Sequence, residues 1–225
     1  MPIFDRIPMP IFDRIPMPIS DRIPLLAFDH IAVSAKTLGE GVAYVEDALG
    51  VRLAAIGHHP HMATHNRLLG LGDLYLEVIA ADPDAAKPNW PRWFDLDHFS
   101  GPPRLTNWVA RTDDLTAALA MALPGTGTPV ALSRGNYRWQ MAVPADGKLP
   151  LDGAHPALIQ WDGPHHPTQA LPDLAIRLTR LDITHPHADL LRALPLSDRR
   201  LQFTIGPVKR LTATFATPNG PRTLH

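Results

Sequence analysis

Apolar and polar positions recur along the chain in an order that repeats. The run LLAFDHIAVS, residues 25–34, is apolar enough to form a strand. Residues 38–50 carry apolar side chains at helical spacing and end in Gly50, a residue typical of helix C-termini. Three further strands are predicted, over residues 51–57, 64–72 and 73–80. Residues 25–82 therefore predict a βαβββ module.

The same order of elements returns in residues 104–163. The pattern predicts a strand, a helix that Asp113 or Asp114 can cap, and three more strands. Residues 28–38 align with 105–115 without a gap, which puts Asn107 opposite His30. LYLEV aligns with ALIQW, which puts Gln160 opposite Glu77. An internal duplication is the simplest account of this repeat.

Three other segments complete the organisation of the chain. Residues 1–24 are three near-copies of MPIFDRIP and are expected to form a flexible tail. Residues 83–103 form a proline-rich, aromatic connector. Residues 172–225 predict a shorter βαββ unit, with its helix over 188–194. The whole predicts an α+β protein of one compact domain.

Composition narrows the classes of partner. The chain has 21 basic and 22 acidic residues and a formal net charge of -1, so no electrostatic footprint for nucleic acid or anionic lipid is present. It has no cysteine, which excludes disulfides and thiolate chemistry and fits a cytoplasmic location. No apolar run approaches the roughly 18 residues of a membrane span. A small-molecule partner is the expectation that remains, and a homodimer is left open.

The candidate chemistry starts with one histidine and one glutamate. Successive side chains of a strand alternate between its faces, so His30 points away from the face that the helix covers. By the same count Glu77 points into the same cleft. A neutral imidazole and a carboxylate from two strands make half of a divalent metal site for Fe, Mn, Ni or Zn. Glu77 is also a candidate proton carrier.

His65 could complete a metal site. With His30 and Glu77 it would give the two-histidine, one-carboxylate composition of non-haem iron sites, and it is a second candidate for proton transfer. Strand alternation puts His65 and Arg67 on one face of the strand and Asn66 on the other. Which of the two faces points into the cleft stays open. Asn66 is a candidate for binding substrate.

Other conspicuous side chains favour structural interpretations. His58, His59 and His61 lie in a proline-bearing stretch that is typical of a solvated turn. Trp161 follows Gln160 and is expected on the helix side of its strand. Arg180 takes the slot of His30 in the third unit and could bind a substrate anion. The connector aromatics could form a lid, but packing is favoured for all four, Trp90, Trp93, Phe94 and Phe99.

These residues carry a resemblance to a known superfamily. The paired modules, the DHIAV first strand and the YLE-type fourth strand resemble the vicinal oxygen chelate superfamily, which includes glyoxalase I, extradiol dioxygenases, methylmalonyl-CoA epimerase and antibiotic-resistance proteins. HHPHMATHNRLLGLGDLYLEVIA and LIQWDG resemble the bacterial glyoxalase-like domain proteins. The likeness covers about residues 26–220 and implies a curved, partly open, antiparallel and mixed sheet around a cleft, with helices outside.

The resemblance also implies four positions for site residues. In metal-dependent members the first and fourth strands of each module supply the ligands, and the matching positions here are His30, Glu77, Asn107 and Gln160. Only the first two are strong ligands for transition metals, so Asn107 and Gln160 fit hydrogen bonding to a substrate better.

Three functions remain in competition. The first is a metal-dependent lyase, isomerase or dioxygenase acting on a small oxygenated molecule. The second is a metal-free protein that binds or sequesters a small molecule in the same cleft. The third is a metal-free acid–base enzyme that uses Glu77.

Overall fold

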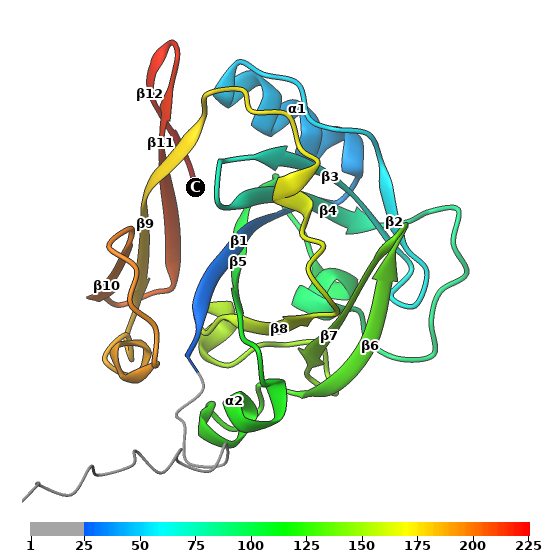
Figure 1. Ribbon diagram of the computed structural model, residues 1–225, viewed down its shortest axis with the longest axis vertical. Helices are drawn as coiled ribbons and strands as arrows, with labels where there is room; N and C mark the ends of the chain where they lie inside the picture. Colours follow the sequence, from blue (N-terminus) through cyan, green and yellow to red (C-terminus); the bar gives the residue numbers. More distant parts are fainter. Residues whose placement is uncertain (1–24) are drawn as a thin grey trace, which may run out of the picture.

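The computed structural model describes residues 25–225, and the predicted tail over residues 1–24 lies outside the described part. The described residues form two sheets (Figure 1). The larger sheet has eight strands in the order β2-β3-β4-β1-β5-β8-β7-β6 and curves until it is nearly closed. Its strands are β1 (Ala27–Ser34), β2 (Gly57–His59), β3 (Thr64–Gly70), β4 (Tyr75–Ala81), β5 (Arg104–Arg111), β6 (Thr128–Arg134), β7 (Tyr137–Val143) and β8 (Ala157–Trp161).

The two βαβββ modules meet along one antiparallel strand pair. β1 pairs with β5, and each has the last strand of its own module on the other side in parallel, β4 beside β1 and β8 beside β5. The interior therefore receives side chains from the first and fourth strands of both modules. This arrangement confirms the predicted α+β class.

Helix α1 (Leu38–Leu49) covers the outer face of the first module. Thr37 and Glu40 form a capping box at its start, and Gly50 ends it in the left-handed conformation with φ 69°. Val45 and Leu49 are fully buried against the sheet. In the second module α2 (Leu115–Met121) starts at Asp114, whose carboxylate accepts a hydrogen bond from the Ala117 amide at 2.9 Å.

The prediction of a strand over residues 51–57 was wrong. The backbone there is irregular, because its polar groups bond outside a ladder: the Leu53 amide donates to Glu46 and the Ala54 amide to the Leu68 carbonyl. The edge strand β2 forms only afterwards, at Gly57–His59, and pairs with Thr64–Asn66 of β3. Two histidines assigned to a turn therefore lie in the sheet.

The connector fills the interior of the curved sheet. Its 3-10 helix η2 (Trp93–His98) buries Trp93, Phe94 and Leu96 in a cluster with inward-facing residues such as Val109 and Ile159. Trp93 and Phe94 pack, as predicted for the connector aromatics. Phe99 is only partly buried, and Trp90 has 44 % of its surface exposed.

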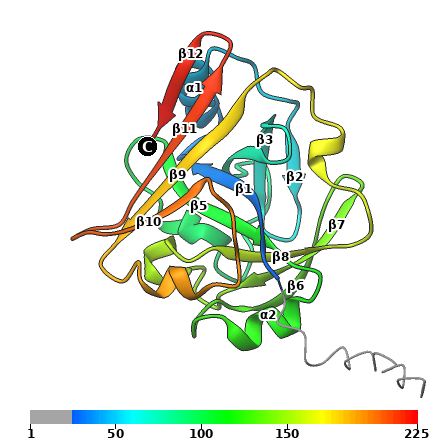
Figure 2. The ribbon, with the colours of Figure 1, turned by 60° about the vertical axis from the view of Figure 1, so that its left-hand side comes forward.

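The C-terminal unit forms the second sheet, in the order β10-β9-β11-β12. Its strands are β9 (Arg177–His185), β10 (Leu201–Ile205), β11 (Arg210–Thr217) and β12 (Gly220–Leu224). Figure 2 shows this sheet in front of β1 and β5, and Phe215 and Leu211 share a core with Ile31 and Trp108. The predicted helix over 188–194 is only the short 3-10 helix η5 (Leu190–Ala193). No helix in residues 25–225 is long and apolar enough to cross a bilayer.

Candidate functional site

His30 and Glu77 come together inside the curved sheet. In the parallel β1–β4 pair, His30 stands opposite Tyr75 and Ala32 stands opposite Glu77, so all four side chains face the interior. Nε2 of His30 lies 3.7 Å from Oε2 of Glu77, and both side chains are buried. The Tyr75 ring stacks on the imidazole at 4.2 Å between centroids and fixes its plane.

Asp29 holds the other nitrogen of His30. The register of β1 against β5 shifts between Phe28 and His30, and such a bulge re-aims a side chain, which here brings Asp29 beside its neighbour. Nδ1–H of His30 donates to Oδ1 of Asp29 at 2.6 Å. Oδ2 accepts from Nε1 of Trp161 at 3.0 Å and from Nε2 of His166 at 3.1 Å.

These contacts determine the charge of Asp29 and the tautomer of His30. Burial raises the pKa of Asp29, but the hydrogen bonds and charges of His166 and His30 outweigh it and hold the pKa well below its ordinary value. Asp29 is therefore a carboxylate, and its bond keeps the His30 proton on Nδ1. In the neutral ring Nε2 then carries the lone pair, and this atom faces Glu77 and the interior.

A second histidine, His59, lies on the other side of Glu77. Its Nε2 is 3.9 Å from Oε1 of Glu77, and it lies between Trp93 and Trp139. Burial, with the nearby positive charge of Arg134, lowers the pKa of His59 to about 3, so the ring is neutral at physiological pH.

Asn66 occupies the point between His59 and Glu77. Its amide nitrogen donates to Oε1 of Glu77 at 2.5 Å and lies 3.3 Å from Nε2 of His59. Nε of Arg134 donates to the amide oxygen at 2.7 Å, which fixes the amide orientation. Arg134 reaches Asn66 across Gly57, where a Cβ would overlap the guanidinium group.

The residues as arranged do not fit a metal ion. Such a site needs three or more protein donors around one point, and within residues 25–225 no three His, Asp or Glu side chains are placed to hold one. The chemical reason is the Asn66 amide, because its N–H group already occupies the Oε1 atom of Glu77 and faces Nε2 of His59. The polar cluster is closed by hydrogen bonds instead.

The cavity at this cluster is small and has aromatic walls. Its volume is about 30 Å³, and Trp93, Tyr137, Trp139 and Trp161 line it together with the cluster. A water molecule needs roughly 10–15 Å³ of such space, so one water-sized group fits. Trp161 also lines an outer cavity of about 400 Å³ that contains Arg111 and His165.

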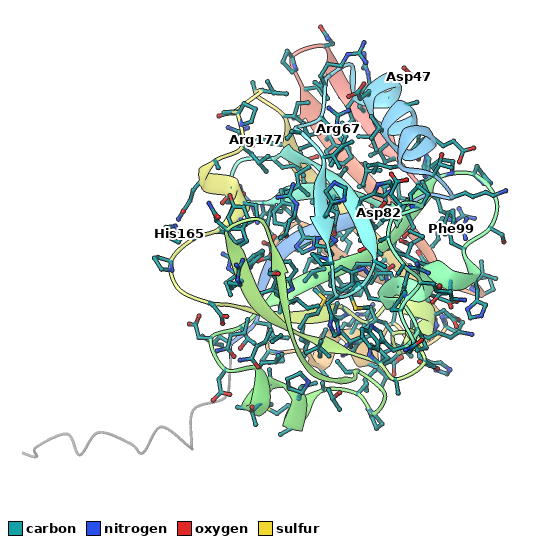
Figure 3. The ribbon with its side chains drawn as sticks, turned by 90° about the vertical axis from the view of Figure 1, so that its right-hand side faces the viewer. Asp47, Arg67, Asp82, Phe99, His165 and Arg177 are labelled. Atoms are coloured by element: carbon teal, nitrogen blue, oxygen red, sulfur yellow. The ribbon has the colours of Figure 1, made fainter. Side chains whose placement is uncertain are left out.

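The other predicted site residues lie elsewhere. His65 faces away from the cluster, because it neighbours Asn66 on β3; its Nδ1 is 3.8 Å from Oδ1 of Asp82, which Figure 3 labels. The triad of His30, His65 and Glu77 is therefore not assembled. Arg180 is exposed on β9 and forms two hydrogen bonds with Asp182, at 2.6 and 2.7 Å.

The two positions of the second module are also displaced from the cluster. Asn107 lines a different, larger cavity. Oε1 of Gln160 accepts from the Leu115 amide at the start of α2 (2.7 Å), so it faces the helix, and Trp161 faces the interior. The sequence analysis expected the opposite, with Gln160 in the cleft and Trp161 on the helix side, and this expectation was wrong.

The exchange has a simple cause in the strand register. If Asn107 corresponds to His30, then Val109 corresponds to Ala32. Ala32 pairs with Glu77, whereas Val109 pairs with Ala157. The alignment of the fourth strands was thus three residues off, and an odd shift turns every side chain to the other face. The second module contributes apolar side chains where the first contributes Glu77.

The sequence analysis missed several contributors to the site, among them Asp29, His59 and Trp161, and also Tyr75, Arg134 and His166. The DH pair was visible, but only the bulge places both side chains together. His59 would have required recognition of the three-residue strand β2. A correct register for β8 would have found Trp161.

Comparisons with known proteins add the following. The sequence model of a family described as glyoxalase-like domain matches residues 28–195. A search of curated proteins finds no match. A hypothetical protein from Staphylococcus aureus has a similar structure, with a TM-score of 0.57 and 13 % identity over 83 % of this chain and 88 % of that one.

Two enzymes match more weakly. Methylmalonyl-CoA epimerase from Mycobacterium tuberculosis gives a TM-score of 0.41 and 16 % identity over 61 % of this chain and 88 % of its own. A variant of 4-hydroxymandelate synthase from Streptomyces coelicolor gives 0.37 and 15 % identity over 66 % and 52 %. The Staphylococcus aureus structure supports the fold. The TM-scores of the two enzymes are too low to carry an argument about activity.

Proposed function

Because the chain belongs to the glyoxalase-like domain family, as its sequence resemblance predicted, we propose that it is an acid–base enzyme of the isomerase or lyase type. It moves a proton on a small oxygenated molecule, with His30 as the base. The observation that carries the proposal is the hydrogen-bonded pair of Asp29 and His30, whose free Nε2 faces Glu77 at 3.7 Å.

The proton transfer follows from the tautomer of His30. Nε2 takes a proton from a hydroxyl group, or from a carbon next to a carbonyl group, of the bound molecule. The imidazolium that forms lies between the Asp29 and Glu77 carboxylates, and their charges stabilise it. When the proton comes from carbon, its return to the former carbonyl carbon, with transfer of the hydroxyl proton to the former carbonyl oxygen, completes an isomerisation. Its delivery instead to an oxygen that departs from the neighbouring carbon, as the carbon–carbon double bond forms, completes an elimination.

Glu77 is held in place for this role. The hydrogen bond from Asn66 binds Oε1 and leaves Oε2 toward His30. Arg134 orients Asn66 in turn, so two side chains, from β3 and β6, support the carboxylate on β4. We propose Asn66 and Arg134 as positioning residues.

The size of the cavity limits the substrate. Only one water-sized group fits beside His30 and Glu77, so the reacting end of the molecule enters and the remainder lies outside. The outer cavity that shares Trp161 has room for the remainder. A compact hydroxy-aldehyde or hydroxy-ketone has the required shape and chemistry.

The experiment incubates the protein with a panel of small hydroxy-aldehydes and hydroxy-ketones in D2O and follows deuterium incorporation and product formation by NMR. His30→Gln and Glu77→Gln should each lower the rate by about 10²–10⁴-fold, the usual contribution of a positioned acid or base. His187→Gln, at an exposed histidine of the C-terminal unit, is the matched control and should keep the full rate.

Three outcomes contradict the proposal. Activity that disappears after treatment with a chelator and returns with Fe, Mn, Ni or Zn would favour the metal-dependent hypothesis. Saturable binding of a panel member without exchange or turnover would favour a sequestering protein. A rate that falls in His65→Gln but not in His30→Gln would move the chemistry to the rim near Asp82.

A further inference from the structure

A second, larger cavity lies away from the His30 cluster. Its volume is about 710 Å³, within the range of small-molecule sites, and its walls come from the connector, β5, the turn at residues 151–153 and the loop before β11. Figure 3 shows Phe99, which lines this cavity, and His165, which lines the outer cavity near Trp161, on opposite sides of the molecule. This cavity is therefore distinct from the outer cavity, and it shares only Phe94 with the small cavity beside His30.

Two nitrogen donors converge on one wall of this cavity. Nζ of Lys209 donates to the Thr106 carbonyl at 2.6 Å. A Cβ placed on Gly153 would lie 2.7 Å from Nδ2 of Asn107 and 3.3 Å from Nζ of Lys209, so both groups lie against the same glycine. Glycine is required at this position for two reasons: a Cβ would overlap the Asn107 amide, and the backbone has a φ of +82°.

The positive charge of this wall is only partly balanced by the protein. Among residues 25–225 no ion pair involves Lys209, although the residue is half-buried. Burial lowers the pKa of Lys209 to about 8, against the attraction of Asp152, which raises it, and with the repulsion of Arg104. Four cationic side chains line the cavity (Arg104, Lys148, Lys209 and Arg210), against two carboxylates, Asp95 and Asp152. Asp95 already pairs with His98 at 2.6 Å.

The backbone around the cavity is unusual as well. Phe94 and Asp95 on one wall have φ of 57° and 54°, and Leu151 and Asp152 by another wall have 56° and 54°. Left-handed residues other than glycine cluster at sites where function maintains the strain. Here both pairs adjoin the same cavity.

We propose that this cavity binds a small oxyanion, a carboxylate or phosphate group, through the Lys209 ammonium and the Asn107 amide. An ammonium that lies near Asp152 but forms no ion pair with it, beside a neutral N–H donor, is an environment that such a group complements. Lys209 lies beyond the residues that match the family model, so the C-terminal unit completes the site. The proposal is independent of the acid–base chemistry at His30.

The experiment titrates the full chain with oxalate and, separately, with inorganic phosphate by isothermal calorimetry. At least one of them should bind with one-to-one stoichiometry, and the comparison distinguishes a carboxylate site from a phosphate site. Lys209→Met should weaken binding at least about tenfold, and Asn107→Asp, which replaces the donor by a negative charge of similar shape, should do the same. Lys36→Gln, at an exposed lysine, is the matched control and should bind as the unaltered protein does.

The result that overturns the proposal is equally specific. Neither anion binding at millimolar concentration, or both variants binding as tightly as the unaltered protein, removes the site. If Lys209→Met fails to fold, Asn107→Asp alone decides. His30→Gln should bind the anion normally, so a failure of the proposed enzymatic function leaves this result unaffected.

Discussion

Replacing Asp29 by asparagine removes one negative charge from beneath His30 while it keeps the size of the side chain. The carboxylate is completely buried and accepts three hydrogen bonds, from His30, Trp161 and His166, at 2.6, 3.0 and 3.1 Å. The amide has only one acceptor oxygen, and its NH2 group would face ring nitrogens that carry protons. The substitution therefore weakens contacts to β1, β8 and the segment after β8 at once.

The magnitude follows from the three bonds. A hydrogen bond to a charged group contributes about 1.5–3 kcal/mol net and a neutral one about 0.5–1.5 kcal/mol, so the change costs about 1 kcal/mol for each bond, or about 3 kcal/mol in the free energy of unfolding. For a domain of this size that loss lowers Tm by roughly 6–12 °C.

The loss should depend on pH in a defined direction. The pKa of Asp29 is lower in the folded protein than its ordinary value of 3.8, so the carboxylate stabilises the fold fully above that value. As the pH falls through 3.8 toward the lower folded pKa, the unaltered protein loses this contribution and the variant does not. The two stabilities should converge in acid.

Urea unfolding of both proteins between pH 7 and pH 3, followed by tryptophan fluorescence, measures the difference. A variant within about 0.5 kcal/mol of the unaltered protein at pH 7, the range of ordinary surface substitutions, would show that Asp29 is not the ionised acceptor described above. A difference that stays constant down to pH 3 would also refute the reasoning.

Two further predictions concern stability. Gly57→Ala should displace Arg134 and lower the free energy of unfolding by about 1–3 kcal/mol, as overpacking does. Gly39→Ala in α1, where a Cβ meets nothing within 4 Å, is the control and should be neutral or stabilising. Equal melting temperatures for the two variants would contradict this prediction. Trp108→Phe removes the indole N–H that donates to the Ala154 carbonyl at 2.8 Å in the core, and it should lower the free energy of unfolding by about 1–3 kcal/mol. A urea midpoint equal to that of the unaltered protein would contradict this prediction.

The sequence predicted the architecture well because the signals for it are local. The spacing of Val45 and Leu49, with Gly50 at the end, identifies α1 without any knowledge of its neighbours. Strand alternation alone places His30 and Glu77 on one face, and these two side chains do meet in the described structure. Their chemical role stays a prediction.

The remainder of the site depends on long-range geometry. Asp29 reaches its position through a bulge that arises only when β5 pairs with β1. His59 belongs to a strand of three residues, too short for any periodic pattern. The side on which Gln160 and Trp161 lie depends on a register of β8 that the repeat of the sequence does not determine.

The contact between Arg134 and Asn66 has a consequence for access to the interior. β2 and β6 are the two ends of the eight-stranded order, and they approach each other without forming a ladder in the described chain. The guanidinium group of Arg134, which passes over Gly57 to Asn66, therefore links β6 to β2 and β3 where no backbone hydrogen bonds join them. Opening the sheet at this point would break the Arg134–Asn66 hydrogen bond and the apolar contacts around Met62 and Leu132, but no row of backbone bonds.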